Sequence, residues 1–331
     1  MVRDLYIDAL RAIGILCIIL AHVYAPNVVT QLRSFDVPLM LFVSGLSFSG
    51  KSMSSSLIRF YYTRTLRLII PTYVFLILFF GLYSLLNHPW DSEKIVNSFL
   101  LLEHNSIGYV WIIKVFLLIM LATPVLIFIN NRLNIIQFLL LILTLYISQL
   151  FIVKIPLYIS FTPQSSVLFN EVISNITGYS IPFLLGLRIK SLSKIEINKA
   201  IVFTFILAII FFMLYIYQNG FELNISSKYK YPPHSFYISY GCLMSLFLWY
   251  LRPLLSILNK SKLLLFIGQN TMWIYLWHIP YVLILNRVLD IWYLKYIIVV
   301  VMSISTYFVQ YRIINTIQSK YNTAFLKYFK G

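Results

Sequence analysis

Three ionisable side chains interrupt an otherwise apolar stretch near the start of the chain, YIDALRAIGILCIILAH at residues 6–22. Asp8 and Arg11 are three residues apart and His22 follows eleven residues later, so on a helix of 3.6 residues per turn all three share one face. At about 1.5 Å per residue, His22 lies roughly 16 Å beyond Arg11, which is about half of a 30 Å hydrocarbon core. We therefore expect Arg11 near one membrane surface and His22 near the midplane, where a neutral imidazole can accept a proton from a substrate.

Charge at that depth costs several kcal/mol unless it is paired or lines a water-filled cavity. One interpretation is an Asp8–Arg11 pair that only orients its helix, with His22 bonded to a neighbouring carbonyl group. A lone ion pair does not explain a histidine three turns further along the same face. We therefore favour a polar, water-accessible core that this helix lines.

A second basic pair, Arg64 and Arg67, lies in the stretch TRTLRLIIPTY. The spacing puts both on one face of a helix, which we expect to lie on the cytoplasmic membrane surface and to end at Pro71. Guanidinium groups present planar forks of donors that match phosphate oxygens, so the pair suits a phosphorylated ligand. Contact with anionic lipid is the alternative, and spacing alone does not separate the two.

A second histidine, His278, lies in the stretch IGQNTMWIYLWHIP. Asn270 or Thr271 can cap this helix, and His278 follows on the same face, again at middle depth. Pro280 can kink the helix and open a cavity beside the histidine. His278 and Thr271 are therefore pocket candidates, and so is Lys114, which either snorkels outward from another span or faces the cavity.

The composition indicates that these residues lie in a membrane protein. Hydrophobic residues make up 60% of the 331 and charged residues only 11%, against about 25% charged in soluble domains. This predicts an all-α, polytopic membrane bundle that forms a single domain over residues 1–331. Apolar runs bounded by polar clusters predict ten transmembrane helices, at 7–25, 36–50, 68–86, 108–129, 135–153, 173–189, 200–217, 235–251, 270–286 and 293–314.

Ten spans put both termini on one side of the membrane, and the basic residues indicate which side. Seventeen lysines and arginines fall at span ends on the side of the termini and seven on the other, so the positive-inside rule predicts cytoplasmic termini. The cytoplasmic set is Arg3, Lys51, Arg59, Arg64, Arg67, Arg132, Arg188, Lys190, Lys194, Lys199, Arg252, Lys260, Lys262, Arg312, Lys320, Lys327 and Lys330. The outer set is Arg33, Lys94, Lys154, Lys228, Lys230, Arg287 and Lys295.

Several classes of function find no support in the sequence. The net charge of +16 is spread over helix ends rather than gathered in a patch, which argues against a nucleic-acid partner. No GxGxxG, P-loop, HExxH, GxSxG or CxxC pattern stands in a suitable context. Cys17 and Cys242 both lie in apolar runs and fit packing roles. We therefore expect no metal site, and the sequence does not indicate an oligomeric state.

Six segments carry a family resemblance: YIDALRAIGILCIILAH, VPLMLFVSGLSFS, TRTLRLIIPTY, YVWIIKVFLLI, IPFLLGLRI and IGQNTMWIYLWHIP. In this order they resemble the acyltransferase-3 family of polytopic membrane acyltransferases, in a stand-alone form without the extra periplasmic hydrolase-like domain of some members. The resemblance implies that Arg11 and His22 form the family's R-x10-H element and that Arg64 and Arg67 form its R-x-x-R element.

The resemblance also implies a reaction. The donor is usually acetyl-CoA from the cytoplasm, and the acceptor is often a hydroxyl of a cell-surface carbohydrate such as O-antigen, capsule or exopolysaccharide, beside membrane lipid. In a bacterial cytoplasmic membrane His22 would be the base, Asp8 would hold Arg11, and Arg64 with Arg67 would bind the CoA phosphates. Arg11 or backbone N–H groups would offset charge on the thioester oxygen. The alternatives are a transporter or flippase, which also carries polar groups at the midplane, and acyl transfer to a lipid or cytoplasmic acceptor.

Overall fold

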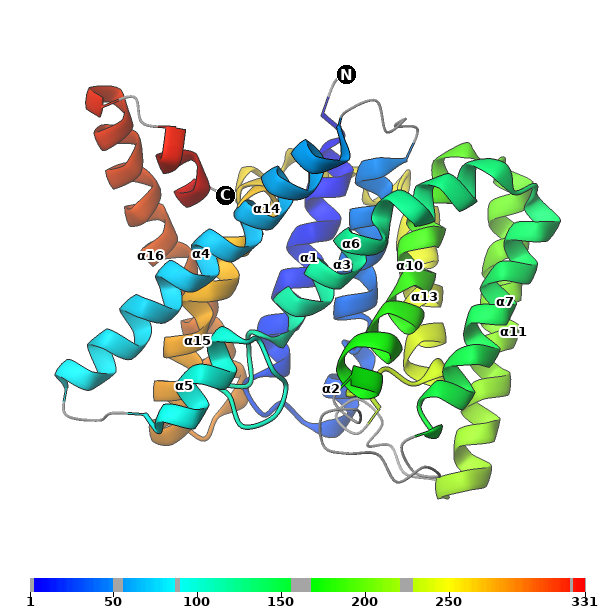
Figure 1. Ribbon diagram of the computed structural model, residues 1–331, viewed down its shortest axis with the longest axis horizontal. Helices are drawn as coiled ribbons and strands as arrows, with labels where there is room; N and C mark the ends of the chain where they lie inside the picture. Colours follow the sequence, from blue (N-terminus) through cyan, green and yellow to red (C-terminus); the bar gives the residue numbers. More distant parts are fainter. Residues whose placement is uncertain are drawn as a thin grey trace. The chain divides into compact units, whose positions relative to one another are not determined.

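The computed structural model describes residues 3–49, 56–86, 90–155, 168–220, 229–321 and 324–330. These residues form helices joined by loops, and no strand occurs among them, which confirms the predicted all-α class. Figure 1 shows these helices coloured in the order of the chain, and by their contacts they group into two compact units. Unit 1 comprises Met1–Ala25, Ile58–Lys114 and Ser261–Gly331, and unit 2 comprises Pro26–Leu57 and Val115–Lys260.

Unit 1 is built around the first helix. Its helices are α1 (Leu5–Ala21), most of α4 (Leu57–Leu85), α5 (Ser92–Phe99), α14 (Lys262–Gln269), α15 (Thr271–Val288), α16 (Trp292–Tyr321) and the 3-10 helix η4 (Ala324–Phe329). Helix α1 packs against α14, α15 and α16. At its contact with α14, Gly268 lies so close to the backbone oxygen of Asp8 that any Cβ would overlap it. The glycine therefore brings the segment before α15 directly against the charged turn of α1.

Unit 2 is built around two helices in backbone contact, α3 (Asp36–Phe48) and α10 (Ser174–Arg188). Gly45 on α3 faces the carbonyl oxygen of Phe183, and Gly186 on α10 faces that of Phe42, at distances that leave no room for a side chain. Its other elements are α2 (Asn27–Leu32), most of α6 (Trp111–Arg132), α7 (Ile135–Ile152), η1 (Leu168–Ile173), η2 (Ile189–Ser191), α11 (Lys194–Asn219), α13 (Ser235–Tyr250) and η3 (Leu254–Lys260).

Each of the ten predicted spans coincides with a helix, but not every helix is long enough to cross a membrane. Among the described residues six helices pass by length and hydropathy: α4, α6, α7, α11, α16 and the stretch Phe169–Ser191 around α10. A seventh candidate is α13 with η3, bent by 81°. With 17 and 13 residues, α1 and α3 fall short of the roughly 20 that a membrane core requires. The count of ten and the cytoplasmic termini therefore stay predictions.

The segment around Pro71 differs from the prediction. Arg64 and Arg67 lie on α4, which runs without a break through Pro71 to Leu85, so the separate interfacial helix ended by Pro71 is wrong. A proline removes one backbone donor, and membrane helices tolerate this where nearby side chains bond the backbone instead. The carbonyl group without its backbone donor is that of Arg67, four residues before Pro71, while the hydroxyl of Thr72 donates to the next carbonyl, that of Leu68, at 2.6 Å.

Candidate active site

The charged turn of α1 forms an ion cluster around one carboxylate. Asp8 is buried and accepts from Arg11 Nη1 at 3.0 Å, which confirms the predicted pair. It also accepts from Arg3 Nε at 2.6 Å and from Arg3 Nη2 at 3.2 Å. The side chain of Arg3 is 58% exposed and that of Arg11 is 30% exposed, so Arg3 is open to solvent, Arg11 is partly buried and the carboxylate is fully covered.

Two further arginines extend this cluster. Arg64 is half-buried on α4 and Arg67 is exposed one turn later. The positive charges of Arg67 and Arg11 both act on Arg64. Arg3 and Arg11 thus bind Asp8 directly, and Arg64 and Arg67 add their positive charge beside Arg11. Such an excess of positive charge, in the form of planar donors, suits an anionic ligand with several phosphate groups.

The two histidines singled out by the sequence lie in contact, although 256 positions separate them in the chain. His22 Nδ1 is 3.0 Å from His278 Nε2, and the rings stack with centroids 5.1 Å apart at an angle of 20°. Helix α1 ends at Ala21, so His22 is its C-cap residue rather than part of the helix as predicted. His278 is fully buried in α15, whereas His22 is half-buried.

The partners of the two rings assign their tautomers. His278 Nδ1 contacts the carbonyl oxygen of Tyr275, which only accepts, so this nitrogen carries a proton. In the neutral ring His278 Nε2 is then an acceptor, and His22 Nδ1 must be the donor in the bond between them. The lone pair of a neutral His22 is therefore on Nε2. Both nitrogens of His278 are used in holding this arrangement.

An aromatic side chain closes one side of the histidine pair. The ring of Tyr109 meets His22 edge-on at 4.8 Å and His278 edge-on at 6.0 Å. The hydroxyl of Tyr275 in turn donates to the backbone oxygen of Tyr109. The pair is thus held by residues from the loop before α6 and from α15 itself, and Tyr109 restricts how His22 can turn.

Two residues that sequence reasoning did not select hold the backbone of His22. Asn286 Nδ2 donates to the carbonyl oxygen of His22 at 3.0 Å, which satisfies one of the carbonyl groups that a helix leaves open at its end. Lys295 Nζ donates to Asn286 Oδ1 at 3.1 Å. The sequence places Lys295 among the basic residues of outer loops, but it is buried on α16. Contacts between distant helices, not local periodicity, determine this position.

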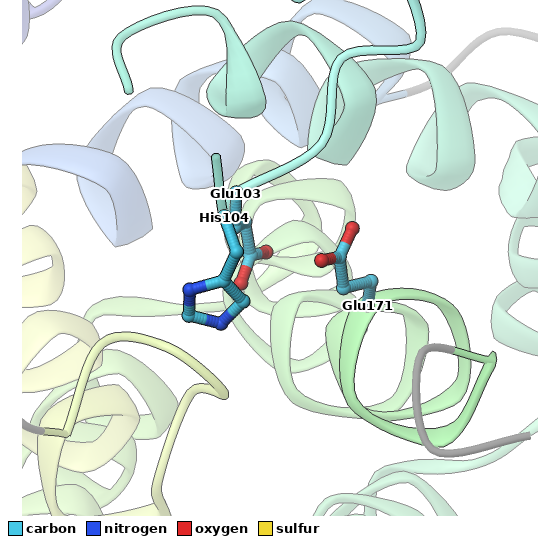
Figure 2. Close-up of side chains that lie close together, drawn as sticks. All are labelled: Glu103, His104 and Glu171. Atoms are coloured by element: carbon cyan, nitrogen blue, oxygen red, sulfur yellow. The ribbon is translucent and has the colours of Figure 1, made fainter. Parts of the chain in front are cut away.

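The remaining candidates lie elsewhere in unit 1. Thr271 begins α15 without a capping bond, and the side chain of Asn270 bonds Phe266 O and Tyr307 instead. Lys114 Nζ lies 3.6 Å from Glu103 Oε1, so it pairs with a loop carboxylate. Figure 2 shows Glu103 beside His104 in the loop after α5, while Glu171, also labelled there, belongs to η1 of unit 2.

Comparison with protein families gives a match over nearly the whole chain. Residues 4–311 match the model of a family described as an acyltransferase domain, Acyl_transf_3. The match includes α1 with its charged turn and His22, α4 with its two arginines, and α15 with His278. No curated protein and no solved structure matches the chain. Because the family model covers nearly the whole chain, the protein belongs to the acyltransferase-3 family.

Proposed function

We propose that the protein is an O-acetyltransferase of the bacterial inner membrane. It would move an acetyl group from cytoplasmic acetyl-CoA to a hydroxyl of an extracytoplasmic cell-surface carbohydrate. Family membership supports acyl transfer in general. The observation that carries the proposed chemistry is the 3.0 Å contact between His22 and His278, together with the tautomers that it requires.

In this proposal His22 is the general base. Its Nε2 takes the proton of the acceptor hydroxyl as the hydroxyl oxygen attacks the thioester carbon. The resulting imidazolium keeps its Nδ1–H bond to the neutral His278, which holds the ring in place without supplying a second charge. The C–S bond then breaks, and the CoA thiolate takes the proton back from His22. The reaction as written uses acetyl-CoA as co-substrate and no metal.

The arginine cluster supplies the donor site in this proposal. Arg64 and Arg67 would bind the phosphates of CoA, and Arg11, held by Asp8, would add to the same positive field. Along the axis of α1, Arg11 lies roughly 16 Å from His22. At that distance Arg11 is better placed to bind the CoA phosphates than the thioester oxygen beside His22. An extended pantetheine arm would cover this separation and bring the thioester to His22.

Acetyl transfer by the protein in its membrane tests the proposal. Cells with the wild-type protein, with no protein and with His22→Ala are compared by mass spectrometry of their surface glycans. Purified protein in liposomes is assayed in parallel for CoA release that depends on added glycan. We expect O-acetyl groups and CoA release only with the wild type. Equal O-acetylation in all three strains, or glycan movement across liposomes without consumption of acetyl-CoA, would contradict it and favour a transporter.

A further inference from the structure

Lys295 is an ammonium group buried on a helix long and apolar enough to cross the membrane. It is 3% exposed and lies on α16. In the part of the chain that the structure describes, no carboxylate lies within 4.0 Å of its Nζ. Its neighbours are the amide oxygen of Asn286 at 3.1 Å and the ring of Tyr24, whose centroid is 5.1 Å away.

These neighbours do not neutralise the charge. An ammonium has three donors, and Asn286 accepts one of them. The face of Tyr24 attracts a cation but accepts no conventional hydrogen bond. A buried ionisable residue in a membrane protein is costly unless a partner or a water-filled path compensates it, and such residues mark the paths of substrates. Lys295 therefore has the charge and donors to hold an anion that binds during the reaction.

The position of Lys295 connects it with the proposed acceptor. Asn286 joins the ammonium to the backbone of His22 through bonds of 3.1 Å and 3.0 Å. Tyr24, two residues after His22, lies over the ammonium with 75% of its own surface exposed. Movement of this one exposed side chain would open Lys295 to a ligand that also reaches His22.

We propose that Lys295 binds an oxyanion of the acceptor, so that the acceptor is an acidic glycan bearing a carboxylate or a phosphate close to the hydroxyl that is acetylated. This inference rests on the proposed acetyl transfer and adds the chemical class of its substrate. A neutral sugar would leave the ammonium without an anionic partner.

The direct test compares three forms of the surface glycan as acceptor for the wild-type protein. One is native, one has its carboxylates reduced to alcohols, and one has its phosphate esters removed by hydrofluoric acid. The modified glycan that lacks the anion bound by Lys295 should have a kcat/KM roughly 30-fold or more lower than the native glycan, because the buried ammonium then has no partner. The arm that responds distinguishes carboxylate from phosphate. Equal kcat/KM for all three overturns the inference while acetyl transfer stands, and no transfer to any form counts against the proposed function instead.

Variants separate anion binding from a purely structural role of Lys295. In Lys295→Met the ratio of kcat/KM for native glycan to kcat/KM for modified glycan should fall to near one. Lys295→Arg should retain most of the wild-type ratio. Lys327→Met is the matched control, because the Lys327 ammonium also lies 5.0 Å from a ring, that of Tyr328, but its side chain is exposed on η4. If Lys295→Met slows transfer to native and modified glycans equally, the lysine only orients Asn286 and the inference is wrong.

Discussion

The two units each contain a buried aspartate shared by two cations, and the two clusters differ in their exposure. In unit 1 Asp8 binds Arg3 and Arg11, whose side chains are 58% and 30% exposed. In unit 2 Asp36 binds Arg33 at 2.7 Å and Lys230 at 3.2 Å, and both of these cations are 8% exposed. The same combination of one carboxylate and two cations is thus partly open to solvent in unit 1 and closed in unit 2.

This difference indicates what each cluster can do. Arg3 and the exposed part of Arg11 can exchange some of their contact with Asp8 for an incoming anion, and Arg64 and Arg67 increase the positive charge beside Arg11. The cations around Asp36 cannot, because they connect the start of α3 with the turn before α13 inside the protein. In the proposed function the Asp8 cluster would therefore bind the ligand, whereas the Asp36 cluster would stabilise the fold.

The largest expected effect follows from breaking the closed cluster. Asp36→Asn takes the shared carboxylate from two buried cations, which should lower the free energy of unfolding by about 3–5 kcal/mol. Asp8→Asn, the matched change in the more open cluster, should cost less, about 1–2 kcal/mol, because Arg3 can turn to water and only Arg11 is left partly buried. Thermal unfolding of both variants in the same detergent measures the difference. If Asp36→Asn and Asp8→Asn lowered the free energy of unfolding equally, the two clusters would not differ in their contribution to stability.

A smaller effect is expected from the arginines beside the open cluster. Arg64→Lys and Arg67→Lys keep the charge but lose the bidentate geometry, so each should weaken acetyl-CoA binding about tenfold, or about 1.4 kcal/mol. Arg59→Lys, an exposed arginine on the same helix, is the control and should bind like the wild type. Isothermal titration with acetyl-CoA provides the measurement. Unchanged affinity in all three variants would mean that these arginines contact lipid instead.

The smallest effect is a pH dependence of the closed cluster. Burial lowers the pKa of Lys230 to about 8, and Asp36 only partly offsets this. Between pH 8 and the unfolded pKa near 10.4, Lys230 keeps its proton in the unfolded chain but loses it in the folded protein. The free energy of unfolding should therefore rise with pH in this range, by less than about 1.4 kcal/mol per pH unit. Unfolding at pH 8 and pH 9 is compared with Lys230→Met, which should lack this increase. The same slope in both proteins would contradict the assignment.

Local features of the fold and the site were predictable from the sequence. Apolar runs of about 20 residues located every long helix, because burial in lipid imposes a continuous apolar stretch. The Asp8–Arg11 pair followed from i,i+3 spacing on one helix. The helix end predicted at Pro71 was wrong because proline ends helices less strictly in a membrane, where a continuous helix still satisfies nearly all backbone groups.

The contacts that complete the site were not predictable in this way. The bond between His22 and His278 joins residues 256 positions apart, and periodicity within one helix contains no information about such a pairing. Lys295 has the sequence features of a residue at a helix end, and only the packing of α16 shows that it is buried next to Asn286. Arg3 was counted as a topology signal, yet it pairs with Asp8.

The role of His22 as the general base is the central claim, and single-turnover acetyl transfer by purified variants tests it most directly. His22→Ala should lower the rate about 10²–10⁴-fold while acetyl-CoA binding stays normal. His278→Gln, whose amide oxygen can still accept from His22 Nδ1, should retain clear turnover, and His278→Ala should fall between the two. A near-normal rate for His22→Ala, with His278→Ala inactive and its acetyl-CoA binding intact, would contradict the claim and exchange the roles of the two histidines.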